Sequence, residues 1–546
     1  MTLTRKYFPV DIFSVKEYGI KKWQDEFFWP VSDGEFLALY ENIEQCFMKH
    51  VNTQPQEISD LLLIQRDLFF GYCHFLHATK VIGEIKSRGL DVLCSNSTPL
   101  YGKLTTGTSI TNGILGKRRT QYDHSSDGNF ARKIKSDTKR FVKSFIHNPN
   151  PFKFLKSVGK SETVFTGSVD PMITQYIKRL PSWVSFKYPW NWLPEDVSYR
   201  MPGGLESNIE NVSSTIINEL RAIAEKNNIS ILDSHIDDLR QLTKRELMNS
   251  AKILCLVKSK INGGIHLLIT GLGNPFNRIL CIAVRQSGGN VTSFSHGAYV
   301  GYYDSPTFAL SEFAISDEFI TYTPESVKLF DKIKSNHPPL RNNRVNIDSC
   351  ESNEFSRIWQ KNRNKLPPES IKRIMIIGYP HTSWRKPQAT ASLSLMHLDL
   401  ELRLVNILKE AGYEVFYKAH PDRLPEIDGI FYEKAKVLKG YFQDYMDMAD
   451  VILFGCIRTT AFSIALCTNK PIIGFIVEPE HYKPFPEVIE LFKKRCRLIY
   501  AEFDERNRIV FDKDELLDAL CRRPDKSPNT EFIEKYMFPA NLSTGS

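Results

Sequence analysis

The first hundred residues carry an apolar pattern with helical spacing. Large apolar side chains recur there at helical intervals, at Phe36, Leu37, Tyr40, Ile43 and Phe47. The stretch from Leu62 to Leu76 repeats the pattern more densely. Apolar residues at that spacing line one face of an α-helix. The pattern predicts a helical accessory layer within a first segment, residues 1–150, whose later part is basic.

From about residue 151 the pattern alternates between short apolar runs and amphipathic stretches. The predicted strands are 164–167, 229–232, 265–270 and 290–295, and the predicted helices are 208–226 and 276–286. Strands that alternate with helices are typical of a parallel sheet. We therefore predict a Rossmann-like α/β domain over residues 151–335.

A second alternating region follows a polar interval, residues 336–370, which contains two Pro-Pro pairs and predicts a linker. The predicted strands there are 373–378, 414–418, 451–455 and 471–476, with a helix at 399–411. We predict a second Rossmann-like domain over residues 371–510 and a C-terminal tail over 511–546. The predicted fold class is α/β, with two Rossmann-like domains facing a cleft, a natural place for a two-substrate reaction.

The composition is that of a folded protein. With 71 Lys and Arg against 63 Asp and Glu, the formal net charge is +8, a mild excess that does not indicate nucleic-acid binding. Ten cysteines occur without a CxxC pair, which favours a reducing cytoplasm and no structural zinc. No window approaches the ~20 apolar residues needed to span a bilayer. We expect a cytoplasmic protein, either free or peripheral on the inner membrane.

Basic residues gather between Lys117 and Lys143. One interpretation is a solvated loop followed by the charged face of a helix. The other is a surface that rests on acidic lipid headgroups or on a lipid-linked acceptor.

The most informative chemistry lies at two predicted strand ends of the second domain. Pro421 stops one strand and leaves His420 at its carboxyl end, with Arg423 close behind. The next strand leads into a helix start with further polar residues, Arg458, Thr459, Thr460 and Ser463. Ligands of open α/β sheets bind outside the carboxyl ends of strands, where helix N-termini offer amide donors to anions. These residues are predicted to bind a nucleotide phosphate; simple helix capping by the threonines is compatible with that role.

Other candidates are less specific. Ser383 and Arg385 lie in a polar loop after the first strand of the second domain, where they can reach donor phosphate or sugar. His296 ends a strand of the first domain beside Gly297, and its alternative role is that of a hydrogen-bonded strand-end histidine.

Carboxylates are the candidates for the base or nucleophile that glycosyl chemistry requires. Glu162 precedes the predicted strand at 164–167, and Asp233 follows the predicted strand at 229–232. The alternative is a solvated charge cluster. The sequence displays no metal-ligand cluster and no DxD loop, so protein cations and amides are expected to neutralise the leaving group. The Gly271-Leu272-Gly273 turn lacks the third glycine of a dinucleotide fingerprint, which argues against NAD.

Three motifs together resemble a known family. They are Ser295-His296-Gly297, Lys418-Ala419-His420-Pro421 and the hydroxyl-rich segment 455–463. Their pairing resembles bacterial surface-polysaccharide glycosyltransferases of the GT-B fold, a group with capsule 3-deoxy-octulosonate (Kdo) transferases, polysialyltransferases and CDP-glycerol glycerophosphotransferases. The resemblance covers roughly residues 265–475.

The resemblance implies that His420, Thr459, Thr460 and Ser463 contact the phosphate of a cytidine nucleotide and that His296 lies near the reaction centre. It further implies a metal-independent transferase with no bound cofactor. This enzyme would move a 3-deoxy-octulosonate or nonulosonate sugar from a CMP-activated donor to a glycan or lipid-linked acceptor of capsule or lipopolysaccharide. The sequence departs from the group in having two threonines where a serine pair is common, and in lacking a clearly matched acidic residue.

Three alternatives stay open at this point. CDP-glycerol-dependent glycerophosphate transfer belongs to the same group. A UDP-sugar 2-epimerase can share the two-domain architecture and needs no acceptor. A non-catalytic protein that only binds a sugar nucleotide would use the same cleft without chemistry.

Overall fold

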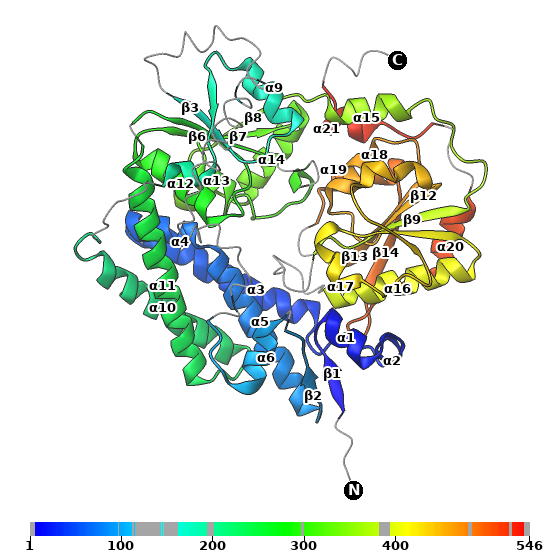
Figure 1. Cartoon of the computed structure of the whole chain (residues 1–546), viewed down its shortest axis with the longest axis horizontal. Helices are drawn as coiled ribbons and strands as arrows, with labels where there is room; N and C mark the ends of the chain where they lie inside the picture. The colour runs from blue at the N-terminus through cyan, green and yellow to red at the C-terminus, as the bar shows by residue number, and fades with distance from the viewer. Residues whose placement is uncertain are drawn as a thin grey trace, which may run out of the picture.

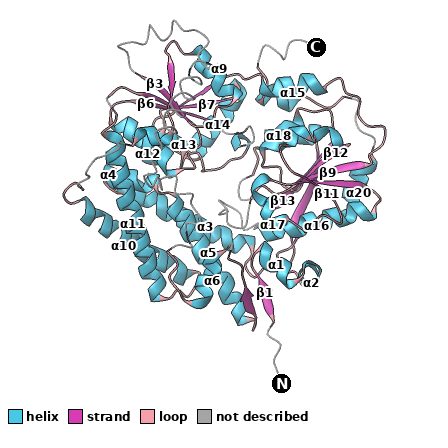
Figure 2. Ribbon diagram, in the orientation of Figure 1, coloured by secondary structure: helices cyan, strands magenta, loops and turns pink. Residues whose placement is uncertain are grey.

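The computed structural model describes residues 6–96, 98–111, 114, 144, 146, 162–193, 201–261, 263–295, 297, 300–381, 394–478, 483–522 and 527–539. This part of the chain forms two mainly parallel β-sheets flanked by helices, with a helical layer beside the first of them (Figures 1 and 2). The fold is therefore α/β, with two Rossmann-like domains and an N-terminal helical region, and this confirms the predicted fold class. The basic segment Lys117–Lys143 lies outside the described residues.

The helical layer begins with six helices. They are α1 (Ile12–Tyr18), α2 (Ile20–Asp25), α3 (Asp33–Thr53), α4 (Gln56–Ile64), α5 (Asp67–Ser87) and α6 (Pro99–Thr106). A short parallel pair, β1 (Tyr7–Pro9) and β2 (Asp91–Leu93), closes its end. Helix α3 starts at a capping box between Ser32 and Glu35 and buries the face that carries Phe36, Ile43 and Phe47. The helical pattern predicted from the sequence is confirmed there.

Two long helices from later in the chain complete this layer. Helices α10 (Leu205–Lys226) and α11 (Asp233–Lys258) pack on each other, α10 contacts α3, and α11 contacts α4. The apolar run 229–232 is the turn between them, so the strand predicted there is wrong. Asn228, with φ of 56°, turns the chain after α10, and only Ile229 of the run is buried, so the run has no apolar face to pair into a sheet.

The first sheet has the order β4-β3-β5-β6-β7-β8, and all its pairs are parallel. Its strands are β3 (Thr163–Thr166), β4 (Val184–Phe186), β5 (His266–Ile269), β6 (Asn290–Phe294), β7 (Glu318–Thr321) and β8 (Asn346–Ser349). Its helices are α9 (Pro171–Arg179), α12 (Pro275–Gln286), α13 (Glu312–Ile315) and α14 (Pro324–Asn336). Because β8 lies inside the predicted linker, the first domain extends to Ser349, and the connection to the second domain contains α15 (Glu354–Asn362).

The second sheet has the order β11-β10-β9-β12-β13-β14-β15, with only the last pair antiparallel. Its strands are β9 (Arg373–Ile377), β10 (Glu414–Lys418), β11 (Lys436–Leu438), β12 (Val451–Phe454), β13 (Ile472–Glu478), β14 (Arg497–Phe503) and β15 (Ile509–Phe511). Its helices are α16 (Ser394–Glu410), α17 (Leu424–Ile427), α18 (Thr460–Leu466), α19 (Pro486–Arg495) and α20 (Lys513–Cys521). All four strands predicted for this domain are confirmed.

The described part of the segment predicted as a tail contains two helices, and the second of them packs on the first domain. Helix α21 (Glu531–Tyr536) contacts both α14 and α19. Thr323 Oγ1 donates to the Lys535 carbonyl at 3.1 Å, and Ser326 Oγ donates to the Tyr536 carbonyl at 3.0 Å. The chain therefore crosses between the domains twice. None of the helices in the described ranges is long and apolar enough to cross a lipid bilayer.

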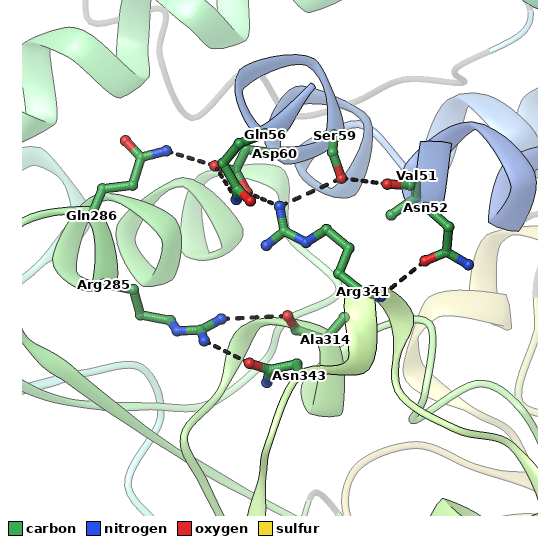
Figure 3. A network of polar contacts seen from close by, with 10 residues as sticks. All are labelled: Val51, Asn52, Gln56, Ser59, Asp60, Arg285, Gln286, Ala314, Arg341 and Asn343. Atoms are coloured by element: carbon green, nitrogen blue, oxygen red, sulfur yellow. Dashed lines mark hydrogen bonds and ion pairs between the residues drawn. The ribbon is translucent and has the colours of Figure 1, made fainter. Parts of the chain in front are cut away.

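A buried polar network fastens the helical layer to the first sheet (Figure 3). Asp60 of α4 is 1% exposed and accepts hydrogen bonds from Gln286 at 2.6 Å and from Arg341 Nη1 at 2.6 Å. The Arg341 backbone amide donates to Asn52 at 2.9 Å, although its φ is +59°. A left-handed conformation costs a non-glycine residue about 1–2 kcal/mol. The ion pair with Asp60 holds the residue there.

Replacement of Arg341 by Ala and by Gly separates the ion pair from the backbone strain. Both variants lose the guanidinium and should unfold more easily than the wild type. Glycine adopts a positive φ without strain, and this outweighs its greater unfolded-state entropy, so Arg341→Gly should be roughly 0.5–1 kcal/mol more stable than Arg341→Ala. Denaturant unfolding measures the difference, with the exposed Arg344→Ala as control. Equal stability of the two variants would show that the positive φ contributes no strain.

Candidate active site

The order in which the chain adds strands to the second sheet reverses between β9 and β12. The chain leaves β9 towards β10 through α16 and leaves β12 towards β13 through α18, so the two connections diverge from neighbouring strands. Open α/β sheets bind ligands outside such a switch point, at the carboxyl ends of the strands. Tyr379 and His381 follow β9, His420 follows β10, and Arg458 and Thr459 follow β12. The fold thus brings the predicted donor-binding segments to one edge.

Arg423 lies beneath this edge and does not reach its surface. Its side chain is fully buried, and Nη1 donates to both Glu401 carboxylate oxygens at 3.0 Å and to the Tyr379 carbonyl at 3.2 Å. Glu401 also accepts hydrogen bonds from the Tyr379 amide and, at 2.9 Å, from the Tyr417 hydroxyl. The predicted contact of Arg423 with the donor is therefore corrected: this guanidinium positions the loops after β9 and β10.

His397 of α16 is buried close to three basic side chains of this edge. The imidazole stacks on the Tyr379 ring with centroids 3.8 Å apart. Burial lowers the pKa of His397 well below its ordinary value, and the positive charges of Arg423, Arg458 and His381 lower it further. The imidazole is therefore neutral, and the nearby cations favour an anionic ligand at the strand ends.

His420 and the residues of the hydroxyl segment keep the places expected from the sequence. His420 caps the short 3₁₀ helix that starts at Pro421, and its Nδ1 accepts from the Asp422 amide at 3.3 Å. That hydrogen bond puts the proton of the neutral ring on Nε2. The side chain is 34% exposed, which allows it to meet a ligand.

The start of α18 combines a cap with a buried hydroxyl. Thr459 Oγ1 accepts from the Phe462 amide at 3.1 Å, so the capping role is confirmed. Thr460 is exposed at the first position of the helix. Ser463 is fully buried, and its Oγ has no hydrogen-bond partner among the described residues. The contact predicted between Ser463 and the phosphate is therefore corrected, because the Ser463 side chain does not reach the surface. Thr460 is the most accessible of the three hydroxyl residues.

The carboxyl edge of the first sheet holds two acidic side chains that influence one another. Asp170 follows β3 and caps α9, with Oδ1 accepting from the Ile173 amide at 2.8 Å, and Glu354 follows β8. Burial raises the pKa of Glu354 above its ordinary value, and the charge of Asp170 raises it further. Burial also raises the pKa of Tyr322 well above its usual range, helped by the same two carboxylates, and this phenol hydrogen-bonds the backbone of Gly297.

Several predicted residues lie outside the described ranges: His296, Ser383 and Arg385. Two others lie away from the strand edge. Glu162 precedes β3 at the amino end of the sheet, where it forms an ion pair with Lys187 at 2.9 Å. Asp233 is the first residue of α11, 84% exposed and 3.2 Å from Arg221. The role predicted for Asp233 as base or nucleophile is corrected, because Asp233 lies on the α10–α11 hairpin and at neither sheet edge. The same role predicted for Glu162 is corrected, because Glu162 precedes its strand and ligands bind beyond the carboxyl ends of strands.

Loops from the two carboxyl edges touch. The segment after β6 pairs with the segment after β13, since the Asp304 amide donates to the Lys483 carbonyl at 3.1 Å and the Phe485 amide to the Tyr302 carbonyl at 2.9 Å. The Arg458 guanidinium lies over the Tyr303 ring, 5.8 Å from its centroid. The cationic edge of the second domain therefore faces the carboxylate edge of the first. In the described part of the chain, neither edge gathers three ligands for a metal ion; the one group that does lies in the helical layer.

Loss of the Glu401 charge should destabilise the second domain. Glu401→Gln leaves the Arg423 charge buried without its counterion, so we expect about 3–5 kcal/mol of lost stability. Glu410→Gln, at the exposed end of the same helix, should change stability by less than about 0.5 kcal/mol. Denaturant unfolding followed by tryptophan fluorescence measures both. Similar midpoints for the two variants would contradict the positioning role of the pair.

Comparison with known proteins finds similarity to solved structures. No family model and no curated protein matches the chain. Among solved structures, UDP-N-acetylglucosamine 2-epimerase from Rickettsia bellii aligns with a TM-score of 0.36 and 13% identity, covering 69% of this chain and 92% of the epimerase.

Proposed function

We propose that the protein is a glycosyltransferase that moves a sugar from a CMP-activated donor to an acceptor glycan. The observation that supports this best is the opposition of two strand edges. Arg458 and His420 belong to a cationic edge suited to a nucleotide phosphate, and Asp170 and Glu354 belong to the edge across from it. Transfer from a nucleotide sugar needs both parts, since the leaving phosphate has to be stabilised and the acceptor hydroxyl has to lose a proton.

The choice of cytidine rests on the motif resemblance. The His420-Pro421 pair and the hydroxyl residues at the start of α18 lie at two strand ends of one sheet edge, and the transferases that these motifs resemble use such motifs to hold the phosphate of CMP. A 3-deoxy-octulosonate or nonulosonate sugar carries its own carboxylate, so the positive potential beside His397 would serve both anions. The proposed acceptor is a growing capsule or lipopolysaccharide glycan, free or lipid-linked, at the membrane surface.

Glu354 is the proposed base. Its pKa is raised, so it accepts a proton more readily than an exposed carboxylate does. Asp170 acts on it through its charge while its own oxygen caps α9. Glu354 thus takes the role of catalytic base that the sequence analysis gave to Glu162 or Asp233.

Nucleotide binding tests the donor site. CMP and CDP should raise the melting temperature, since a ligand at 100 times its Kd stabilises the folded state by about 2.7 kcal/mol, whereas UDP, GDP and NAD should not. His420→Ala and Arg458→Ala should abolish the shift. Lys372→Ala, which removes an exposed cation at the amino end of the same sheet, should keep it. A response to UDP alone would favour a UDP-sugar epimerase, and no response to any nucleotide would contradict the site.

Glu354→Gln tests the base. Release of CMP from a CMP-sugar in the presence of acceptor should fall by about 10²–10⁴-fold, while the CMP-induced thermal shift remains. Glu325→Gln is the control, since Glu325 is a half-buried carboxylate of α14 that pairs with Lys328. Because a raised pKa keeps Glu354 protonated at low pH, the rate should rise with pH through that pKa.

Asp170→Asn sharpens this test. Asparagine still caps α9 but removes the neighbouring negative charge, so the acidic limb of the pH–rate profile should move to lower pH. An unchanged limb would show that Glu354 does not control the rate. Turnover with CDP-glycerol but not with CMP-sugars would identify glycerophosphate transfer, and CMP binding without any turnover would indicate a binding protein.

A further inference from the structure

Three side chains with metal-binding chemistry meet where α3 packs on α10. Cys46 and His50 are four residues apart on α3, so they share one face of the helix, and Glu219 faces them from α10. One ligand atom from each of the three residues lies within 4.8 Å of the others. Thiolate, imidazole and carboxylate together are a ligand set that suits zinc.

The distances match those of a tetrahedral zinc ion. Glu219 Oε2 lies 3.4 Å from Cys46 Sγ and 3.3 Å from His50 Nε2. Zn–S bonds of about 2.3 Å and Zn–N and Zn–O bonds of about 2.0–2.1 Å set the S···O and N···O edges of a tetrahedron at about 3.5 and 3.3 Å. The other carboxylate oxygen, Oε1, binds Lys49 Nζ at 2.7 Å. One carboxylate oxygen of Glu219 thus contacts Lys49, and the other lies close to Cys46 and His50.

His50 supplies an independent observation. Its side chain is 2% exposed, yet neither ring nitrogen makes a hydrogen bond within the described structure, even though Nε2 is close to Glu219. An unsatisfied buried polar atom costs about 1–3 kcal/mol, so burial of both nitrogens is unfavourable without a partner. A thiol–carboxylate hydrogen bond with a lysine ion pair would satisfy Cys46 and Glu219 but leaves His50 unexplained. A metal ion provides the partner for Nε2.

We propose that Cys46, His50 and Glu219 bind one structural Zn²⁺ ion, with water as the fourth ligand. On binding, the Cys46 thiol loses its proton to solvent, and the ion joins residues separated by 173 positions in the sequence. The ion crosslinks α3 to α10 and so connects the N-terminal helices to the α10–α11 hairpin. This site lies in the helical layer and does not depend on the proposed transferase activity. The ligands of this site come from two helices far apart in the sequence, so no CxxC pair indicates the site.

Cobalt substitution and metal analysis of the full-length protein test the site. Protein purified without chelator should retain about one zinc per chain. After replacement by Co²⁺ it should show a near-ultraviolet thiolate-to-cobalt band with visible bands of tetrahedral cobalt. Zn²⁺ added to the metal-free protein should raise its melting temperature by at least several degrees. Cys46→Ser and Glu219→Gln should lose the bound metal, whereas Cys255→Ser, which removes an exposed cysteine of α11, should keep it.

The outcomes separate this proposal from the donor site. If wild-type protein keeps no metal and its cobalt form lacks the thiolate band, the site does not exist, even where the variants fail to fold. Equal zinc content in the wild type and in Cys46→Ser would also overturn it. The thermal shift with CMP should persist in metal-free protein at a lower starting temperature, so failure of one proposal leaves the other measurable.

Discussion

The buried ion pair between Arg423 and Glu401 determines the shape of the candidate donor site. Glu401 stands on α16 and collects hydrogen bonds from the loop after β9, from the end of β10 and from the 3₁₀ turn that carries His420. Only Nη1 of Arg423 makes these hydrogen bonds, and Nε and Nη2 make none among the described residues, so the carboxylate of Glu401 is the main compensation for burial of the guanidinium. Through its hydrogen bonds Glu401 connects the two loops. Whatever binds above them meets His420 and Tyr379 in fixed positions.

The same principle operates at the other end of the molecule. Asp60 is as buried as Glu401, and it joins α4 to α12 and to the turn at Arg341. Apolar packing between helices and a sheet tolerates sliding, whereas a buried carboxylate with several donors accepts one arrangement. Each domain thus has buried polar contacts inside a largely apolar core, and the second domain also buries Asp399 between Arg403 and Arg508. The proposed zinc site would add another polar contact between α3 and α10.

The sequence predicted what depends on local pattern. Strands β3, β5, β6, β9, β10, β12 and β13 were located because each is a continuous apolar run between turn residues, and the placement of His420 followed from Pro421. The run 229–232 has the same apolar pattern but forms the turn of a helical hairpin, in which only Ile229 is buried and Leu232 is exposed. The roles of Arg423, Glu354 and Glu219 depend on contacts with distant residues. No residue spacing in the sequence indicates such contacts. The sequence therefore predicts that Arg423 contacts the ligand, and it does not indicate Glu354 as a base.

The return of α21 to the first domain has a consequence for synthesis on the ribosome. Domains generally fold in order as they emerge, and the sheet that ends at Ser349 can form early. Thr323 and Ser326, however, cannot form their hydrogen bonds to the carbonyls of Lys535 and Tyr536 until these residues are synthesised, after the whole second sheet. The nascent first domain therefore exposes the surface beside α14 throughout the synthesis of the second. The contacts that align the two strand edges, from Lys483 and Phe485 as well as from α21, are all made after the first sheet, so a competent site is delayed until the second domain has emerged.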